Sequence, residues 1–312
     1  MEKTLLAEAR TARRAFAGTL LFSLLAGLLV IAQAALLSQI VNGLFLNGWS
    51  RTNAAPLFLL LLLTITLRAA NQVALQWAAT AVSTRVKQAL RRRFVANLLA
   101  LGPAHAQYEH SAELSLTLTS GIDSLDSYFQ AYLPALFAAV LIPLAILLVA
   151  LPIDWLTGLV FLLTAPLIPT FMILIGRGAG ALAANRYRQL GQLSAHFLDV
   201  MQGLTTLKLF NRSKAQTAII AQMSNQYRET TLAVLRLAFL SAFVLELLAT
   251  ISVAVVAVEI GLKLLYGRMI FADALFLLVL APEFYQPLRQ LGAKFHAGRD
   301  GTAVADRLAP IL

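Results

Sequence analysis

Several ionisable side chains lie inside long apolar stretches of this sequence, where a charge is energetically unfavourable. Arg68 lies in LLLTITLRAANQVALQW, Glu246 lies in VLRLAFLSAFVLELLATISVAVVAVEIG, and Glu283 and Arg289 lie in LAPEFYQPLRQLGAKFHAG. On insertion scales, a charged group at the centre of a bilayer costs about 3 kcal/mol. Because arginine binds carboxylates and glutamate binds ammonium groups, these residues predict a polar pathway for an anionic or zwitterionic solute.

The same residues also have structural interpretations. Ion pairs among them would fix the packing of helices, and Arg289 could extend to the membrane surface, because it is near the end of its stretch. Tyr285 stands beside Glu283 and either lines the pathway or packs against other helices. Pro282 and Pro287 flank this pair and predict a bend in the helix.

The other residues with chemical potential form no recognisable centre. The chain has no cysteine, which excludes disulfides and thiolate metal sites. His105, His110, His196 and His296 include no pair at the i, i+4 spacing of a helical metal site, although one of them remains a possible haem ligand. No nucleophile-elbow pattern accompanies the serines. We therefore expect no catalytic residue and no metal site, and haem is the one cofactor left open.

Six apolar stretches are long enough to cross a bilayer, which takes about 20 residues in a helix. Hydrophobic residues make up 59% of the chain, the mean hydropathy is +0.75, and only 13% of residues are charged. These features predict an all-α membrane protein. We place its spans at about residues 16–45, 56–82, 132–151, 155–175, 232–265 and 272–291.

Positive charge is concentrated on one side of these spans. Most of the 25 lysine and arginine residues lie before the first span, after the sixth, or in the long joins after the second and fourth. The short joins on the other side hold Arg51, Lys263 and Arg268. Cytoplasmic loops carry such an excess, so we expect a multi-pass plasma-membrane protein with both termini in the cytoplasm. The same rule explains the net charge of +10 without a nucleic-acid partner.

Both long joins have helical patterns and contain a polar break. The first breaks at Gly102-Pro103 before AHAQYEHSAELS, and the second breaks within TLKLFNRSKAQ. We expect the membrane helices to continue into the cytoplasm as two hairpins, each with a short transverse segment at its end. These segments either dock onto a cytoplasmic partner or are solvated loop tips. The candidate docking residues are Tyr108, Glu109 and Glu113 in the first segment, and Lys208, Leu209, Phe210, Asn211 and Arg212 in the second.

This arrangement resembles the transmembrane domain of ABC exporters that have six helices and long intracellular loops. The second loop carries the family's G-x-x-T-L-K-x-F-x-R pattern as Gly203, Thr206-Leu207-Lys208 and Phe210-Asn211-Arg212. The first loop has Ala112-Glu113-Leu114 where that family usually has Gly-Glu-Leu. The resemblance implies that both loops dock onto nucleotide-binding domains, which would hold ATP and Mg²⁺.

Longer segments between Thr164 and Gly298 resemble the CydDC-type thiol-reductant exporters, and their D subunits in particular. The most specific match is the Pro-Glu-Phe-Tyr run in the sixth span. The resemblance implies half of a heterodimeric, ATP-driven pump in the bacterial plasma membrane, paired with a CydC-like second half. It also implies a link to the export of cysteine and glutathione, to cytochrome bd assembly and to haem.

The 312 residues contain no G-x-x-x-x-G-K-[ST] loop for binding phosphate. We therefore expect residues 1–312 to be a membrane domain without a nucleotide-binding domain, and not an enzyme unless such domains join it. Arg68, Glu246, Glu283, Tyr285 and Arg289 would line the substrate pathway. The alternatives are a secondary transporter driven by an ion gradient and a non-transporting membrane factor that assists assembly of an oxidase.

Overall fold

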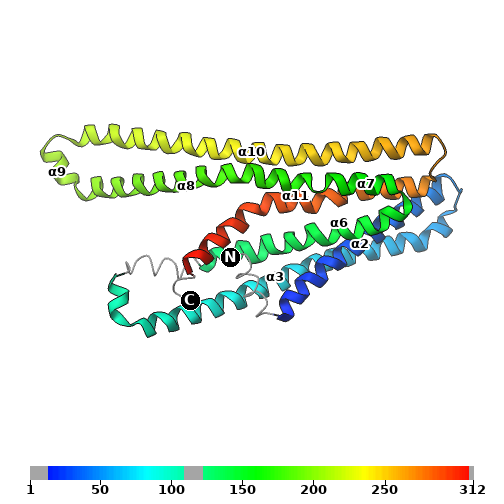
Figure 1. The fold of residues 1–312 in the computed structure, drawn as a ribbon, viewed down its shortest axis with the longest axis horizontal. Helices are drawn as coiled ribbons and strands as arrows, with labels where there is room; N and C mark the ends of the chain where they lie inside the picture. The colour runs from blue at the N-terminus through cyan, green and yellow to red at the C-terminus, as the bar shows by residue number, and fades with distance from the viewer. Residues whose placement is uncertain (1–12, 109–121, 309–312) are drawn as a thin grey trace. The chain divides into compact units, whose positions relative to one another are not determined.

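The computed structural model describes residues 13–108 and 122–308, and the regular structure within these ranges is entirely helical (Figure 1). The predicted all-α class is therefore confirmed. In chain order the helices are α2 (Arg13–Phe45), α3 (Arg51–Tyr108), α5 (Ile122–Asp126), the π-helix η2 (Ser127–Tyr132), α6 (Leu133–Ile153), α7 (Trp155–Thr164), α8 (Leu167–Gln202), α9 (Leu204–Leu209), α10 (Ser213–Leu265) and α11 (Phe271–Leu308).

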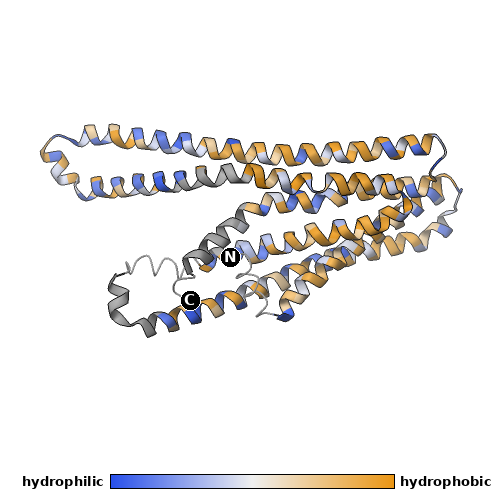
Figure 2. Ribbon diagram, in the orientation of Figure 1, coloured by the Kyte–Doolittle hydropathy of each residue, from blue (hydrophilic) through white to orange (hydrophobic). Residues whose placement is uncertain are grey.

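Six helical segments in the described ranges are long and apolar enough to cross a membrane, as the sequence predicts. Figure 2 shows long apolar runs along these helices, and many of their leucine, isoleucine and phenylalanine side chains are exposed in the protein. Lipid can cover such faces, so they need no further layer of protein. The segments are Arg13–Phe45, Thr52–Asn97, Ser127–Ile153, Trp155–Ile175, Ser213–Leu265 and Phe271–Phe295.

Two boundaries of the membrane helices differ from the prediction. The second membrane helix begins at Arg51 rather than near Pro56, because the carbonyl of Ser50 already accepts hydrogen bonds from the amides three and four residues later. The predicted fourth span is divided into α7 and α8 at Pro166. Proline has no N–H to continue the helical ladder, which explains the interruption.

Two of the helices are far longer than a membrane span, which agrees with the predicted helical extensions. α3 has 58 residues and α10 has 53, so each is roughly 80 Å long or more, against a hydrocarbon core of about 30 Å. α3 also continues past Gly102 and Pro103, where the sequence predicted a break, and ends at Tyr108. A proline within a helix removes one hydrogen bond, and here the helix continues beyond it.

The chain forms two compact units. Unit 1 comprises Met1–Ile168 and Leu248–Leu312, and unit 2 comprises Pro169–Leu247. In unit 1, α2 packs against α3, α6 and α11, and α11 also packs against α6 and η2. Gly27 allows the close approach of α2 to α6, because a Cβ atom at this position would lie 3.4 Å from the Cα of Ile142. This four-helix packing positions the candidate site.

Unit 2 is a helical hairpin whose end is crossed by the short helix α9 (Figure 1). After α9, the backbone of Asn211 adopts a left-handed conformation with a φ of 53°. The amide of Arg212 donates to the carbonyl of Leu207 at 2.8 Å and closes the turn. The break in the helix therefore falls inside TLKLFNRSKAQ, as predicted from its polar residues.

Candidate functional site

A polar cavity of about 470 Å³ lies inside unit 1, with walls from α2, α3, α6 and α11. Sites for small molecules have volumes of roughly 300–1,000 Å³, so the cavity can hold an amino acid or a short peptide. Apolar residues of α2, α3 and α6 form much of the wall, whereas its charges come from α3 and α11. The polar and charged side chains of the wall are Ser23, Arg68, Asn71, Gln72, Glu283, Gln286, Gln290 and Lys294.

Arg68 and Glu283 meet in this cavity and form a bidentate ion pair. Arg68 Nη1 donates to Glu283 Oε1 at 3.0 Å, and Arg68 Nη2 donates to Glu283 Oε2 at 2.9 Å. Arg68 Nη1 also donates to Gln33 Oε1 at 2.9 Å. The side chains are 34% and 26% exposed. The pair neutralises two charges within apolar helices, which fits the structural interpretation. Both side chains also stay partly accessible to a solute in the cavity, which fits a substrate pathway.

The wall beside this pair includes a proline inside a helix and a buried asparagine. Pro287 lines the cavity inside α11 and has no N–H for the carbonyl of Glu283, four residues earlier. The buried Asn71 donates from Nδ2 to the carbonyl of Phe22 at 3.0 Å. Its Oδ1 has no hydrogen-bond partner in the described part of the chain. This oxygen is itself buried, so a solute in the cavity meets the charged side chains and glutamines of the wall rather than Asn71 Oδ1.

Tyr285 packs on a different face of α11. Its side chain is only 1% exposed, and its hydroxyl lies 2.6 Å from Thr164 Oγ1 at the end of α7. The ring contacts Phe161 edge-on, and the neighbouring Phe284 stacks on Phe161 with ring centroids 4.3 Å apart. The structure thus places Tyr285 in the packing between α11 and α7, and its participation in the substrate pathway stays a prediction.

The other two predicted pathway residues are not among the described residues that line the cavity. Glu246 is an exposed residue of α10 in unit 2. Arg289 is a half-buried residue of α11. Each of the two takes part in at least one further interaction. Their participation in transport stays a prediction.

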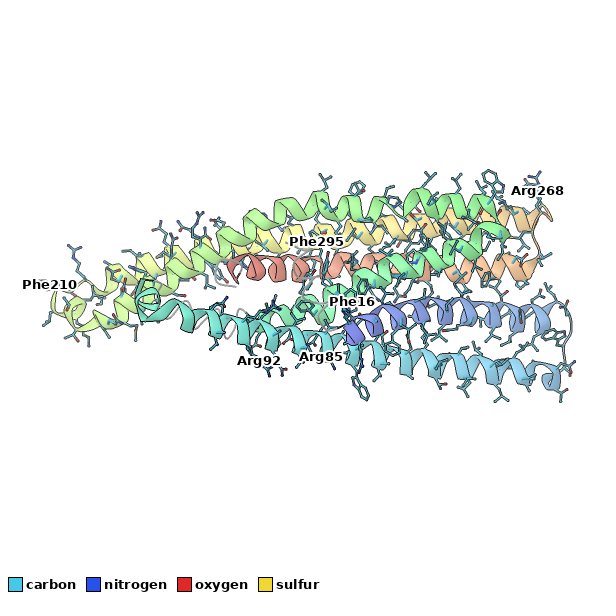
Figure 3. All side chains as sticks on the ribbon, turned by 60° about the horizontal axis from the view of Figure 1, so that its bottom comes forward. Phe16, Arg85, Arg92, Phe210, Arg268 and Phe295 are labelled. Atoms are coloured by element: carbon cyan, nitrogen blue, oxygen red, sulfur yellow. The ribbon has the colours of Figure 1, made fainter. Side chains whose placement is uncertain are left out.

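The predicted docking residues of the second loop form the end of the hairpin in unit 2. Phe210 is 74% exposed and lies at the tip in Figure 3. Tyr108 is the last residue of α3, while Glu109 and Glu113 lie outside the described residues. An exposed aromatic side chain among basic ones suits a partner surface, but docking remains a prediction. The residues at the tip, all exposed, are Lys208, Leu209, Phe210, Asn211 and Arg212.

A charge network that the sequence did not reveal joins Asp154, at the start of α7, to α10. Lys263 Nζ donates to Asp154 Oδ1 at 2.5 Å and also pairs with Glu259, one turn earlier on α10. Thr157 Oγ1 lies 2.7 Å from both Asp154 Oδ2 and Glu259 Oε2. Burial alone would raise the pKa of Asp154, but hydrogen bonds from Lys263 and Thr157 lower that pKa below its usual value. The network therefore fixes α7 against α10.

A second network joins α3 to α5. Lys87 Nζ donates to Asp126 Oδ2 at 2.6 Å and to Asp123 Oδ1 at 3.0 Å. Arg91 donates to Asp123 at 2.8 Å, and Ser83 Oγ donates to Asp126 Oδ1 at 2.6 Å. Partial burial raises the pKa of Asp126, but the hydrogen bonds from Lys87 and Ser83 lower it overall. From the sequence alone, Lys87 and Arg91 indicated only which side of the membrane this segment occupies.

Comparison with curated proteins shows relatives of about twice this length. The chain is 37% identical over 310 residues to the transport ATP-binding protein AarD of Providencia stuartii. It is 36% identical over 300 residues to the glutathione/L-cysteine transport system ATP-binding/permease protein CydD of Escherichia coli K12. It is 33% identical over 283 residues to the corresponding CydC protein of Bacillus subtilis 168. These matches cover 97%, 94% and 91% of the chain but 53%, 51% and 50% of the relatives.

The expectation that the protein is not an enzyme is wrong in the light of these relatives. It rested on the missing phosphate-binding loop within 312 residues. The relatives are named as ATP-binding proteins, two of them as ATP-binding/permease proteins, so both functions share one polypeptide there. The chain spans about half their length and corresponds to their transmembrane part.

The family described as "ABC transporter transmembrane region" matches residues 16–288. This match extends from α2 into α11 and includes both the cavity of unit 1 and the hairpin of unit 2. The six candidate spans and the two long helical extensions agree with it. The chain is a multi-pass membrane protein that belongs to the family of ABC transporter transmembrane regions.

Proposed function

We propose that this chain is the membrane-spanning part of an ATP-driven exporter for cysteine, glutathione and related thiols, and that the cavity around Arg68 and Glu283 lies on its substrate pathway. The bidentate pair in a polar cavity carries this proposal, because the wall holds charges of both signs at a place accessible to a small solute. The names of the CydD and CydC relatives supply the substrate class.

The proposed assembly contains a second, CydC-like half and two nucleotide-binding domains that bind ATP and Mg²⁺. Both termini and both long helical extensions lie on the cytoplasmic side of a bacterial plasma membrane, in agreement with the distribution of lysine and arginine. The exposed tip around Phe210 docks onto a nucleotide-binding domain. Hydrolysis then changes the relative stability of inward-facing and outward-facing states, for which the substrate has different affinities.

Haem is less well supported at this site, since no histidine is among the described residues that line the cavity. A secondary transporter would move the solute with an ion gradient and without ATP, so experiment can distinguish it from an ATP-driven exporter. A non-transporting assembly factor would move none of these solutes.

Uptake of labelled cysteine, glutathione and haem into inverted membrane vesicles tests the proposal. The vesicles contain the complete transporter with its partner. We expect ATP-dependent uptake of cysteine and glutathione that survives collapse of the ion gradients by ionophores. Uptake that needs a gradient but no ATP would support a secondary transporter. Uptake of none of the three solutes would support the assembly factor, and uptake of haem alone would reject the thiol substrate.

A further inference from the structure

The charges in the cavity wall have an asymmetric arrangement. Arg68 and Glu283 stand together at one level, with hydrogen bonds of 2.9 and 3.0 Å between them. Gln286, Gln290 and Lys294 follow on the cavity side of α11. Spacings of three and four residues place these side chains on one helical face. Lys294 is three turns, or about 16 Å, from Glu283 along the helix.

The two members of the pair are complementary to the two charges of an α-amino acid head group. Such a group holds a carboxylate and an ammonium on one carbon atom. When such a head group enters between Arg68 and Glu283, Arg68 binds the carboxylate of the ligand in place of that of Glu283. Glu283 in turn binds the ammonium of the ligand in place of the Arg68 guanidinium. Every charge keeps an opposite partner. A ligand with only one of the two charges would leave one charge of this partly exposed pair without a partner, which is unfavourable.

Sulfur has no comparable partner in the cavity. The chain contains no cysteine, and no group of metal-binding side chains occurs among the described residues. The polar groups of the wall are guanidinium, carboxylate, amide, hydroxyl and ammonium. They recognise hydrogen bonds and charge, so a thiol would contribute little to binding there.

We infer that the cavity recognises the α-ammonium and α-carboxylate of an amino acid head group rather than the thiol, and that Lys294 binds a second carboxylate of a longer substrate. This inference rests on the proposed function. Cysteine and glutathione, named for the relatives, share this head group, which glutathione carries on its γ-glutamyl residue. Only glutathione has a second carboxylate, on its glycine residue.

The dimensions of the cavity agree with this assignment. A tripeptide spans roughly 10 Å when extended, and the long side chain of Lys294 shortens the remaining distance to the pair. Lys294 has no ion-pair partner among the residues that the structure describes, so its ammonium group is available to a ligand. One site can thereby accept two substrates of different size, with Lys294 used only by the larger one.

Competition on the unaltered, complete transporter in inverted vesicles tests the recognition rule directly. Labelled cysteine is the transported solute. S-methylcysteine and S-methylglutathione keep the head group and lose the thiol, so each should compete within about threefold of its parent. N-acetylcysteine keeps the thiol and loses the ammonium, and cysteamine loses the carboxylate. Both should compete at least about tenfold more weakly than cysteine.

The outcomes separate the inference from the proposed function. If cysteine and glutathione are transported but N-acetylcysteine competes as well as cysteine, the head-group rule is wrong while the proposed function stands. If S-methylation abolishes competition, the thiol is recognised, and the rule is again wrong. If neither cysteine nor glutathione is transported, the proposed function fails together with this inference.

Lys294→Gln tests the second carboxylate site, with Arg85→Gln as a matched control. Arg85, labelled in Figure 3, is an exposed cation of α3 and is not among the described residues that line the cavity. The Lys294 variant should lose at least about tenfold in apparent affinity for glutathione and little for cysteine. Equal losses for both substrates would overturn the role of Lys294, and so would no loss for either. The competition series on the unaltered protein still tests the head-group rule if this variant fails to assemble.

Discussion

The guanidinium of Arg68 binds both carboxylate oxygens of Glu283, although the two residues are 215 positions apart in the chain. The contact connects α3 to α11 and pairs two charges that a bilayer would otherwise disfavour. It also leaves both side chains partly accessible from the cavity. An ion pair with these properties can exchange partners with a zwitterionic solute, whereas a fully enclosed pair would serve only to hold the helices together.

Phe210→Ala should reduce the coupling between ATP hydrolysis and transport. The aromatic side chain is exposed at the tip of unit 2, where it can enter a groove of a nucleotide-binding domain. Loss of such an anchor typically weakens a contact by more than 1 kcal/mol. We expect about fivefold fewer molecules of cysteine moved per ATP hydrolysed, measured in vesicles. Phe197→Ala, an exposed phenylalanine of α8 away from the tip, is the control. An unchanged ratio for Phe210→Ala would remove this residue from the docking surface.

Tyr285→Phe should affect stability and not substrate affinity. The change removes the hydrogen bond with Thr164 and keeps the aromatic packing with Phe161. One buried hydrogen bond contributes about 1 kcal/mol, so thermal unfolding of the purified protein should shift to a lower temperature. The exposed Tyr266→Phe should cause no shift. A selective loss of cysteine affinity in Tyr285→Phe would instead return Tyr285 to the substrate pathway.

The network around Asp154 should make stability depend on pH. The pKa of this carboxyl is lower in the folded protein than its ordinary value of 3.8. The folded state therefore favours the ionised form, and the resulting stabilisation is complete above the ordinary pKa. It is lost as the pH falls from about 3.8 toward the lower folded-state pKa. Thermal unfolding measured across this window should show the loss in the unaltered protein and a smaller one in Asp154→Asn. Asp199→Asn, at an exposed position, should behave as the unaltered protein does. Identical pH profiles for all three would contradict the stabilising role.

Lys263→Met tests the same network at neutral pH. The substitution keeps the apolar length of the side chain but leaves Asp154 and Glu259 without their shared cation. Because these carboxylates are largely buried, we expect a loss of about 3 kcal/mol in stability. The measurement is the midpoint of chemical unfolding in detergent. A midpoint equal to that of the unaltered protein would show that the network contributes no stability.

The long helices and their number were predictable because hydropathy and length decide them almost alone. Arg68 and Glu283 were also predictable as special positions, since a charge in an apolar helix is unusual. The pairing of Arg68 with Glu283 was not predictable, because it depends on which helices face each other and on how far each is shifted along its axis. The faces of α11 illustrate the same difficulty. Glu283 and Tyr285 are two residues apart, yet one lines the cavity and the other packs against α7.

Other features escaped prediction because their residues have ordinary roles in the sequence. Asp154 stood in a short turn, where an acidic residue is common, and Lys263 indicated only which side of the membrane it occupied. The division of the fourth span followed from Pro166, whereas the helix α3 continued through Pro103. The same residue type thus ended one helix and not another.

Binding of cysteine to the purified, complete transporter tests the central claim most directly. Isothermal titration would compare the unaltered protein with Arg68→Ala, and with Arg85→Ala on the same helix as the control. We predict that Arg68→Ala weakens binding at least about tenfold, because the substrate carboxylate loses its partner, and that Arg85→Ala binds normally. Equal dissociation constants for all three proteins would contradict the assignment of this cavity as the substrate site.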